Sequence, residues 1–162
     1  MMSRSTDNQA QSIRYGENDA TPAQLAAFYQ RLGHPMSANS DQIAAMAQRS
    51  VAFVTAWNLD ELIGIARGVS DGVRGYLTEC KLDPAFQGPA AITRTDGRIE
   101  HDALGVAREM AERVLAAIRR TGVDRVDALA YGTEVDFLEE LGFRRGAGLV
   151  GMTLGPGGSR AN

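Results

Sequence analysis

The carboxylate of Glu79 is the first candidate for chemistry in this sequence, because it lies at the centre of a segment with the alternation of a β-strand. In residues 76–82, that alternation predicts Leu77, Glu79 and Lys81 on one face and the other four residues on the opposite face. A carboxylate held on a strand can accept a proton from a substrate. It can also be an ordinary charge on a half-exposed face, and both interpretations stay open.

The neighbouring residues predict the hairpin that positions this carboxylate. Residues 62–69 form an apolar run that contains Gly64 and Gly68, and residues 70–72, Ser-Asp-Gly, are typical of a turn. Pro84 ends the second strand, because proline donates no backbone hydrogen bond and restrains Asp83 before it. The sequence therefore predicts two antiparallel strands, with Glu79 in the middle of the second.

This hairpin resembles the central hairpin of the GNAT superfamily of N-acetyltransferases. The resemblance extends over roughly residues 13–154. Its most specific parts are residues 62–67, 70–72, 76–77, 82–84 and 86–88. It implies an α/β fold with a mixed, mostly antiparallel sheet, helices on both faces and a central V-shaped cleft. It also implies transfer of an acetyl group from acetyl-CoA to the amine of a small molecule.

The remaining elements fit one domain, residues 12–154, between flexible tails at 1–11 and 155–162. Thr21 as N-cap, Pro22 and Gln24 predict a helix that ends near Gly33. The other expected elements are a short strand at 12–17, a helix from Ser40 to about Arg49, a strand at 51–57, a long amphipathic helix from Asp102 to Gly122, a strand at 125–130, a short helix capped by Thr133 and a last strand at 149–154.

The resemblance implies roles for several side chains. Glu79 matches the acidic position that takes the proton of the amine. The tyrosine that often protonates the leaving thiolate is absent, because the corresponding pair is Phe137-Leu138, and Tyr131 is the candidate substitute. In similar proteins the first two helices and their linker wall the acceptor site. The substrate-binding candidates are Tyr29, His34, Arg67 and Asp71.

Members of the superfamily bind the diphosphate of CoA through a Gln/Arg-x-x-Gly-x-Gly/Ala loop at a helix N-terminus. Gln87 and Gly88 match the start of that pattern, whereas Ala90 and Ile92 occupy the later glycine positions. The predicted cofactor-binding residues are Cys80, Leu82, Gln87, Gly88, Ala90, Arg94 and Arg98. Two alternatives stay open: an enzyme of this fold that works without CoA, and a non-catalytic ligand-binding protein.

Composition narrows the classes of protein to which this sequence could belong. The net charge of −3 and the lack of a basic run give no support to nucleic-acid binding. A single cysteine, Cys80, excludes an internal disulfide and a cysteine-built zinc site, and the spacing of the two histidines predicts no metal. We find no membrane-length apolar run and no signal peptide, so we expect a soluble cytoplasmic protein. We also expect a homodimer that pairs near residues 149–154, since an exposed apolar edge promotes association.

Overall fold

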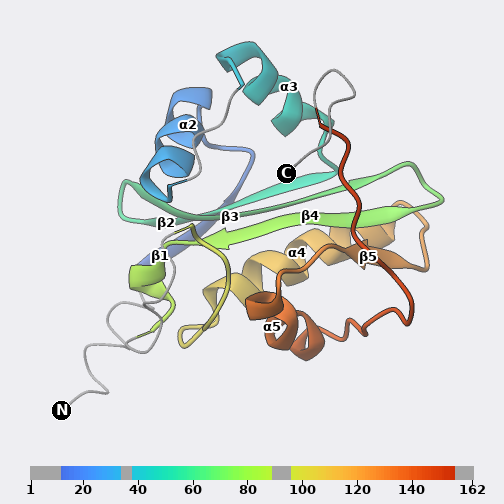
Figure 1. The fold of residues 1–162 in the computed structure, drawn as a ribbon. Helices are drawn as coiled ribbons and strands as arrows, with labels where there is room; N and C mark the ends of the chain where they lie inside the picture. The colour runs from blue at the N-terminus through green and yellow to red at the C-terminus, as the bar shows by residue number, and fades with distance from the viewer. Residues whose placement is uncertain (1–11, 34–37, 89–95, 156–162) are drawn as a thin grey trace.

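The computed structural model describes residues 12–33, 38–88 and 96–155. Five strands form one sheet in the order in which they occur along the chain (Figure 1). They are β1 (Ile13–Glu17), β2 (Ala52–Asn58), β3 (Glu61–Ser70), β4 (Gly75–Leu82) and β5 (Val126–Ala128). Each neighbouring pair is antiparallel except β4 and β5, which are parallel. The predicted mixed, mostly antiparallel sheet is confirmed.

Helices cover both faces of this sheet. Figure 1 shows α2 (Pro22–Arg31) and α3 (Ser40–Arg49) on one face, and α4 (Val106–Arg120) and α5 (Val135–Glu140) on the other. Two single 3₁₀ turns, η1 (Pro84–Phe86) and η2 (Gly132–Glu134), join the elements. Each face has its own apolar core, because β2 and β3 send alternate side chains to opposite sides: Val54 and Ile63 pack in the α4 core, and Phe53 and Leu62 in the α2–α3 core.

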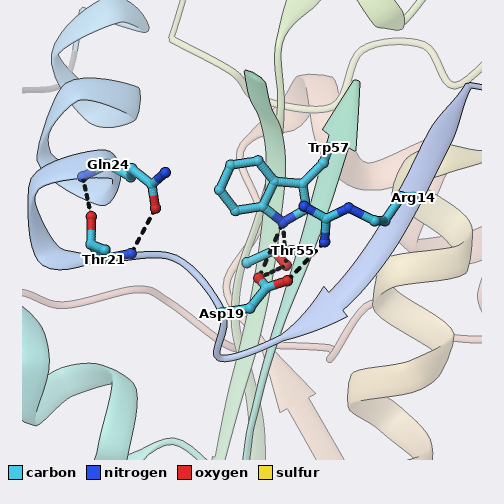
Figure 2. A network of polar contacts seen from close by, with 6 residues as sticks. All are labelled: Arg14, Asp19, Thr21, Gln24, Thr55 and Trp57. Carbon is cyan, nitrogen blue, oxygen red and sulfur yellow. Dashed lines mark hydrogen bonds and ion pairs between the residues drawn. The ribbon is translucent and has the colours of Figure 1, made fainter. Parts of the chain in front are cut away.

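The start of α2 is fixed by two polar arrangements, both drawn in Figure 2. Thr21 and Gln24 form the predicted capping box. Just before it, the Asp19 carboxylate accepts hydrogen bonds from Thr55, from Trp57 Nε1 at 3.1 Å and from Arg14 at 3.0 Å. These bonds attach the chain leading into α2 to β1 and β2. The placement of α2 over the sheet is therefore set at its first turn.

A β-bulge breaks the alternation predicted for β4. Arg67 of β3 is paired with Glu79, yet the next residue, Gly68, is paired with Leu77, so Thr78 is the extra residue. Leu77 consequently packs in the α4 core together with Cys80, whereas Glu79 faces α2. The expectation that Leu77 shares a face with Glu79 is wrong, because strict alternation assumes a strand without a bulge.

Several element boundaries differ from those predicted. Asn39, not Ser40, caps α3, with Gln42 completing the capping box. Helix α4 begins at Val106 and not at Asp102, since Gly105 before it has the left-handed conformation (φ 71°). Tyr131, not Thr133, precedes the turn that leads into α5.

The last predicted strand is absent. Residues 149–154 form no strand, and their large apolar side chains are exposed, Met152 by 91%. A groove of about 870 Å³ lies between this segment, β5 and α5. The alternation of Val150, Met152 and Leu154 suits a strand, but a strand also needs a neighbour to complete its hydrogen bonds, and none of the described residues provides one.

Candidate active site

Glu79, Tyr29 and Arg67 come together in the structure. The bulge turns Glu79 toward α2, where the Tyr29 hydroxyl donates a hydrogen bond to Glu79 Oε1. Arg67, the partner of Glu79 on β3, places its guanidinium 3.6 Å from Glu79 Oε2. Two of the predicted site residues, Tyr29 of α2 and Arg67 of β3, therefore contact the carboxylate of a third, Glu79 of β4.

Burial controls the protonation of this group. Glu79 is 21% exposed, and burial raises its pKa to about 7, against a smaller lowering by the charge of Lys81. Burial also lowers the pKa of the Arg67 guanidinium. The Nε of Arg67 is buried and makes no hydrogen bond to any residue in the described part of the chain. A carboxylate with a pKa near neutrality can accept and release a proton at physiological pH.

The two parallel strands separate beside Glu79. Pairing between β4 and β5 extends from Gly75 to Leu77 and stops at the bulge. Beyond it, residues 79–82 of β4 are paired with β3 alone among the strands. The resemblance places a V-shaped cleft where these two strands separate, and the edge of β4 that has no pairing to β5 begins next to Glu79.

Residues 96–102 lie along the far part of this edge. The Leu82 N–H donates to the carbonyl of Gly97 at 3.0 Å, and Lys81 Nζ donates to the carbonyl of Asp96 at 3.1 Å. Gln87 is 1% exposed and holds the segment in place. Its Nε2 donates to the carbonyls of Leu82 and Arg98, and its Oε1 accepts the N–H groups of residues 100 and 101.

The start of α4 is occupied by a side chain of the same segment. Asp102 accepts the N–H of Ala107 with one carboxylate oxygen and the N–H of Arg108 with the other, each at 2.9 Å. These are two of the groups that the first turn of a helix leaves without an internal partner. The carboxylate therefore takes the position in which a helix N-terminus would otherwise attract an anion.

The predicted cofactor residues have mixed outcomes. Cys80 is buried, with Sγ 3.7 Å from the carbonyl of Ala107, and burial raises the pKa of its thiol. Gln87 has all its side-chain groups engaged, and Gly88 (φ 125°) allows the close approach of Ala103. Arg98 pairs with Asp96 at 3.2 Å and stacks on the ring of Tyr131. Ala90 and Arg94 lie outside the described residues.

Two further candidates lie away from Glu79. Asp71 is in the exposed β3–β4 turn, where its carboxylate accepts the N–H groups of Val73 and Arg74, both at 2.8 Å. Tyr131 is exposed, and its described contacts are with Arg98 and Glu134. His34 falls outside the described residues.

Lys81 and Glu134 were not among the predicted site residues, and Asp102 was predicted only as an acidic residue at the start of the long helix. Lys81 and Glu134 interact electrostatically across the cleft, and burial raises the pKa of Glu134, against lowering by a hydrogen bond from Tyr131 and by the charges of Lys81 and Arg98. A usable signal existed for Asp102. Residues 102–107 read Asp-Ala-Leu-Gly-Val-Ala, which is the superfamily's loop pattern with aspartate in place of the first Gln or Arg.

The part of the chain that the structure describes offers neither a metal site nor a membrane-spanning helix. Among the residues that the structure describes, no group of three or more His, Cys, Asp or Glu side chains could hold a metal ion. None of the described helices is long and apolar enough to cross a membrane.

Comparisons with known proteins give similarity in structure alone. No sequence family and no curated protein matches the chain. A protein from Deinococcus radiodurans R1, provisionally named an acetyltransferase, is 24% identical with a TM-score of 0.61, covering 88% of this chain and 90% of that one. A Staphylococcus aureus protein of unknown function, also provisionally assigned as an acetyltransferase, is 15% identical with a TM-score of 0.68, covering 88% and 98%.

A GNAT-family acetyltransferase from Streptococcus pneumoniae TIGR4 is 15% identical with a TM-score of 0.62, covering 87% of this chain and 98% of that one. Three findings indicate the same fold: the order of strands and helices, the parallel pair that separates, and the similarity to these solved structures. The chain therefore has the fold of the GNAT superfamily of N-acetyltransferases.

Proposed function

We propose that this protein transfers an acyl group to the amine of a small molecule, with Glu79 accepting the proton of the amine. The observation that carries the proposal is a carboxylate whose pKa is about 7, held between Tyr29 and Arg67 where β4 separates from β5. An alkylamine has a pKa near ~10.4 and is mostly protonated at neutral pH, so it needs such a base before it can react.

The reaction has a simple balance. The amine nitrogen attacks the carbonyl carbon of a thioester, forming the C–N bond, and the C–S bond breaks. Glu79 takes one proton from the ammonium before the attack, and the second proton that the nitrogen loses on forming the amide passes to the thiolate, which leaves as a thiol. Positioning the two reactants can by itself contribute roughly 7–11 kcal/mol to lowering the barrier.

Acetyl-CoA is the donor that the fold implies. The residues that would contact its acetyl group differ in suitability from those that would contact its diphosphate. The edge of β4 at residues 78–81 is available for the acyl end beside Glu79. The residues at the other end do not fit a diphosphate in the conformation observed, because Asp102 already occupies the N-terminus of α4 and Gln87 is fully engaged. The proposal therefore rests on the acyl end of the donor.

An assay with two donors tests this function. A panel of small amines is incubated with acetyl-CoA or with S-acetyl-N-acetylcysteamine, a short thioester without a diphosphate, and acetylated products are detected by mass spectrometry. We expect an N-acetylated product that Glu79→Gln diminishes. Absence of product from both donors with every amine would reject the transferase function and favour a ligand-binding protein of the same fold.

We further propose that the protein is a homodimer. The support is the exposed apolar alternation at residues 149–154 next to a β5 strand whose outer edge has no strand partner among the described residues. A second copy could complete both, since its own residues 149–154 could pair with this β5 edge.

A further inference from the structure

Asp102 makes contacts that resemble those of a bound phosphate group. Its two oxygens accept the N–H groups of Ala107 and Arg108 at the first turn of α4, both at 2.9 Å. Its negative charge also acts on the cleft edge, where it contributes to raising the pKa of the Cys80 thiol. A negatively charged group at this place is favoured by the helix dipole and by the free N–H groups.

A second, independent set of contacts keeps the segment around Asp102 in place. The Gly97 carbonyl accepts the Leu82 N–H, so the segment pairs with the same edge of β4 that borders the cleft. Gly97 also packs so closely on Leu32 of α2 that a Cβ atom would come 2.6 Å from that side chain. Ile99 is fully buried in the α4 core. The position of Asp102 is thus set by backbone pairing and burial, as well as by its own hydrogen bonds.

We propose that Asp102 determines donor specificity by excluding a diphosphate from the N-terminus of α4. This inference rests on the proposed acyl transfer, and it assigns the protein to thioester donors that lack a diphosphate. A CoA diphosphate would have to displace the carboxylate or lie beside it. Displacement loses two hydrogen bonds, and proximity places like charges together.

The experiment measures binding of free CoA by calorimetric titration, so that no acetyl transfer is needed. Asp102→Asn removes the charge and keeps one acceptor oxygen, whereas Asp102→Ala also frees the two N–H groups. Asp41→Asn is the matched control, because Asp41 is an exposed aspartate in the first turn of α3 and its replacement changes the net charge equally. Circular dichroism and thermal unfolding establish that each variant is folded.

We expect CoA to bind weakly or undetectably to the parent and to Asp41→Asn. The affinity of the Asp102 variants for CoA should be higher by roughly 10- to 1,000-fold. Removing one like charge has an effect of this size, smaller in water and larger in a partly buried site. Binding by the parent as tight as by Asp102→Asn would overturn the proposal, and so would the lack of any gain in folded variants. The parent titration alone is decisive if it shows tight binding.

Turnover of S-acetyl-N-acetylcysteamine separates this inference from the proposed function. It should fall in Glu79→Gln and stay the same in Asp41→Asn, because Asp41 is an exposed residue of α3. If the parent does not turn over the short donor, acyl transfer from that thioester is rejected. A gain of CoA binding in Asp102→Asn would still support the role of Asp102 in excluding the diphosphate.

Discussion

The hydroxyl of Tyr29 donates to the carboxylate of Glu79, 50 residues away in the chain. Because Tyr29 is buried on α2 and Glu79 lies on β4, this bond makes the first helix part of the site. The anchoring of α2 by Thr21, Asp19 and Trp57 therefore contributes to the geometry of the base.

Replacing Tyr29 with Phe should move the activity profile to higher pH. The hydroxyl stabilises the charged carboxylate, so its loss raises the pKa of Glu79 further. The pH dependence of kcat/KM, measured with a saturating donor, checks this. A profile identical to that of the parent would show that the bond does not influence the base.

Glu79→Gln should lower turnover of an amine by about 10²–10⁴-fold at neutral pH, the usual effect of losing a general base. In the parent, kcat/KM should rise with pH through the Glu79 pKa of about 7 as the carboxylate is deprotonated. Recovery of the variant at high pH would indicate that the amine loses its proton to water. Full activity of the variant at every pH would exclude Glu79 as the base.

The same group should influence stability with a definite sign. The pKa of Glu79 is raised in the folded protein to about 7, so the folded state holds its proton more tightly than the unfolded chain. This stabilisation is fully present below the ordinary value of 4.5 and is lost as the pH rises through about 7. The free energy of unfolding of the parent minus that of Glu79→Gln should decrease across this window. A constant difference would contradict the raised pKa.

Asp19→Ala should destabilise the fold by about 1–3 kcal/mol, because it removes a shared acceptor and leaves the buried Thr55 hydroxyl without an acceptor, while Trp57 Nε1 keeps only its bond to Thr55. Burial alone would raise the pKa of Asp19, but the hydrogen bonds from Thr55, Trp57 and Arg14 bring it below its ordinary value. Its contribution is present above that value and should vanish in acid. Urea unfolding measures the loss. Glu17→Gln, at the exposed end of β1, is the control and should unfold like the parent.

Light scattering at micromolar concentration should give the mass of a dimer. Val150→Asp combined with Met152→Asp should shift it to a monomer, since charges on the exposed segment oppose burial against a second copy. Glu140→Lys, an exposed charge reversal on α5, provides a comparison. A monomeric parent would rule out the dimer.

Local signals were sufficient to predict much of the fold. The capping box of Thr21 and Gln24, the turn before β4 and the stop at Pro84 depend on residues a few positions apart, and the structure confirms each. Tyr29, Arg67 and Glu79 were selected by resemblance, and their meeting depends on the tertiary fold.

The predictions that were wrong concern features that depend on how separate segments pair with one another. The bulge at Thr78 arises from how β4 pairs with β3, and no property of Thr78 alone indicates it. Asp102 caps α4 from outside the helix, across the left-handed Gly105, so the apolar period could not distinguish the capping residue from the first turn. Residues 149–154 have a strand pattern, but pattern alone does not provide a pairing partner.

The extra residue in β4 also makes the site sensitive to chain length. Removing Thr78 would restore regular alternation while leaving Leu77 and Cys80 inward and Glu79 toward α2. The straightened strand could then continue along β5 past Leu77 and close the gap between them. A shortening of one residue, with no change in either side chain that contacts Glu79, would thus extend the parallel pairing toward Glu79 while preserving the core.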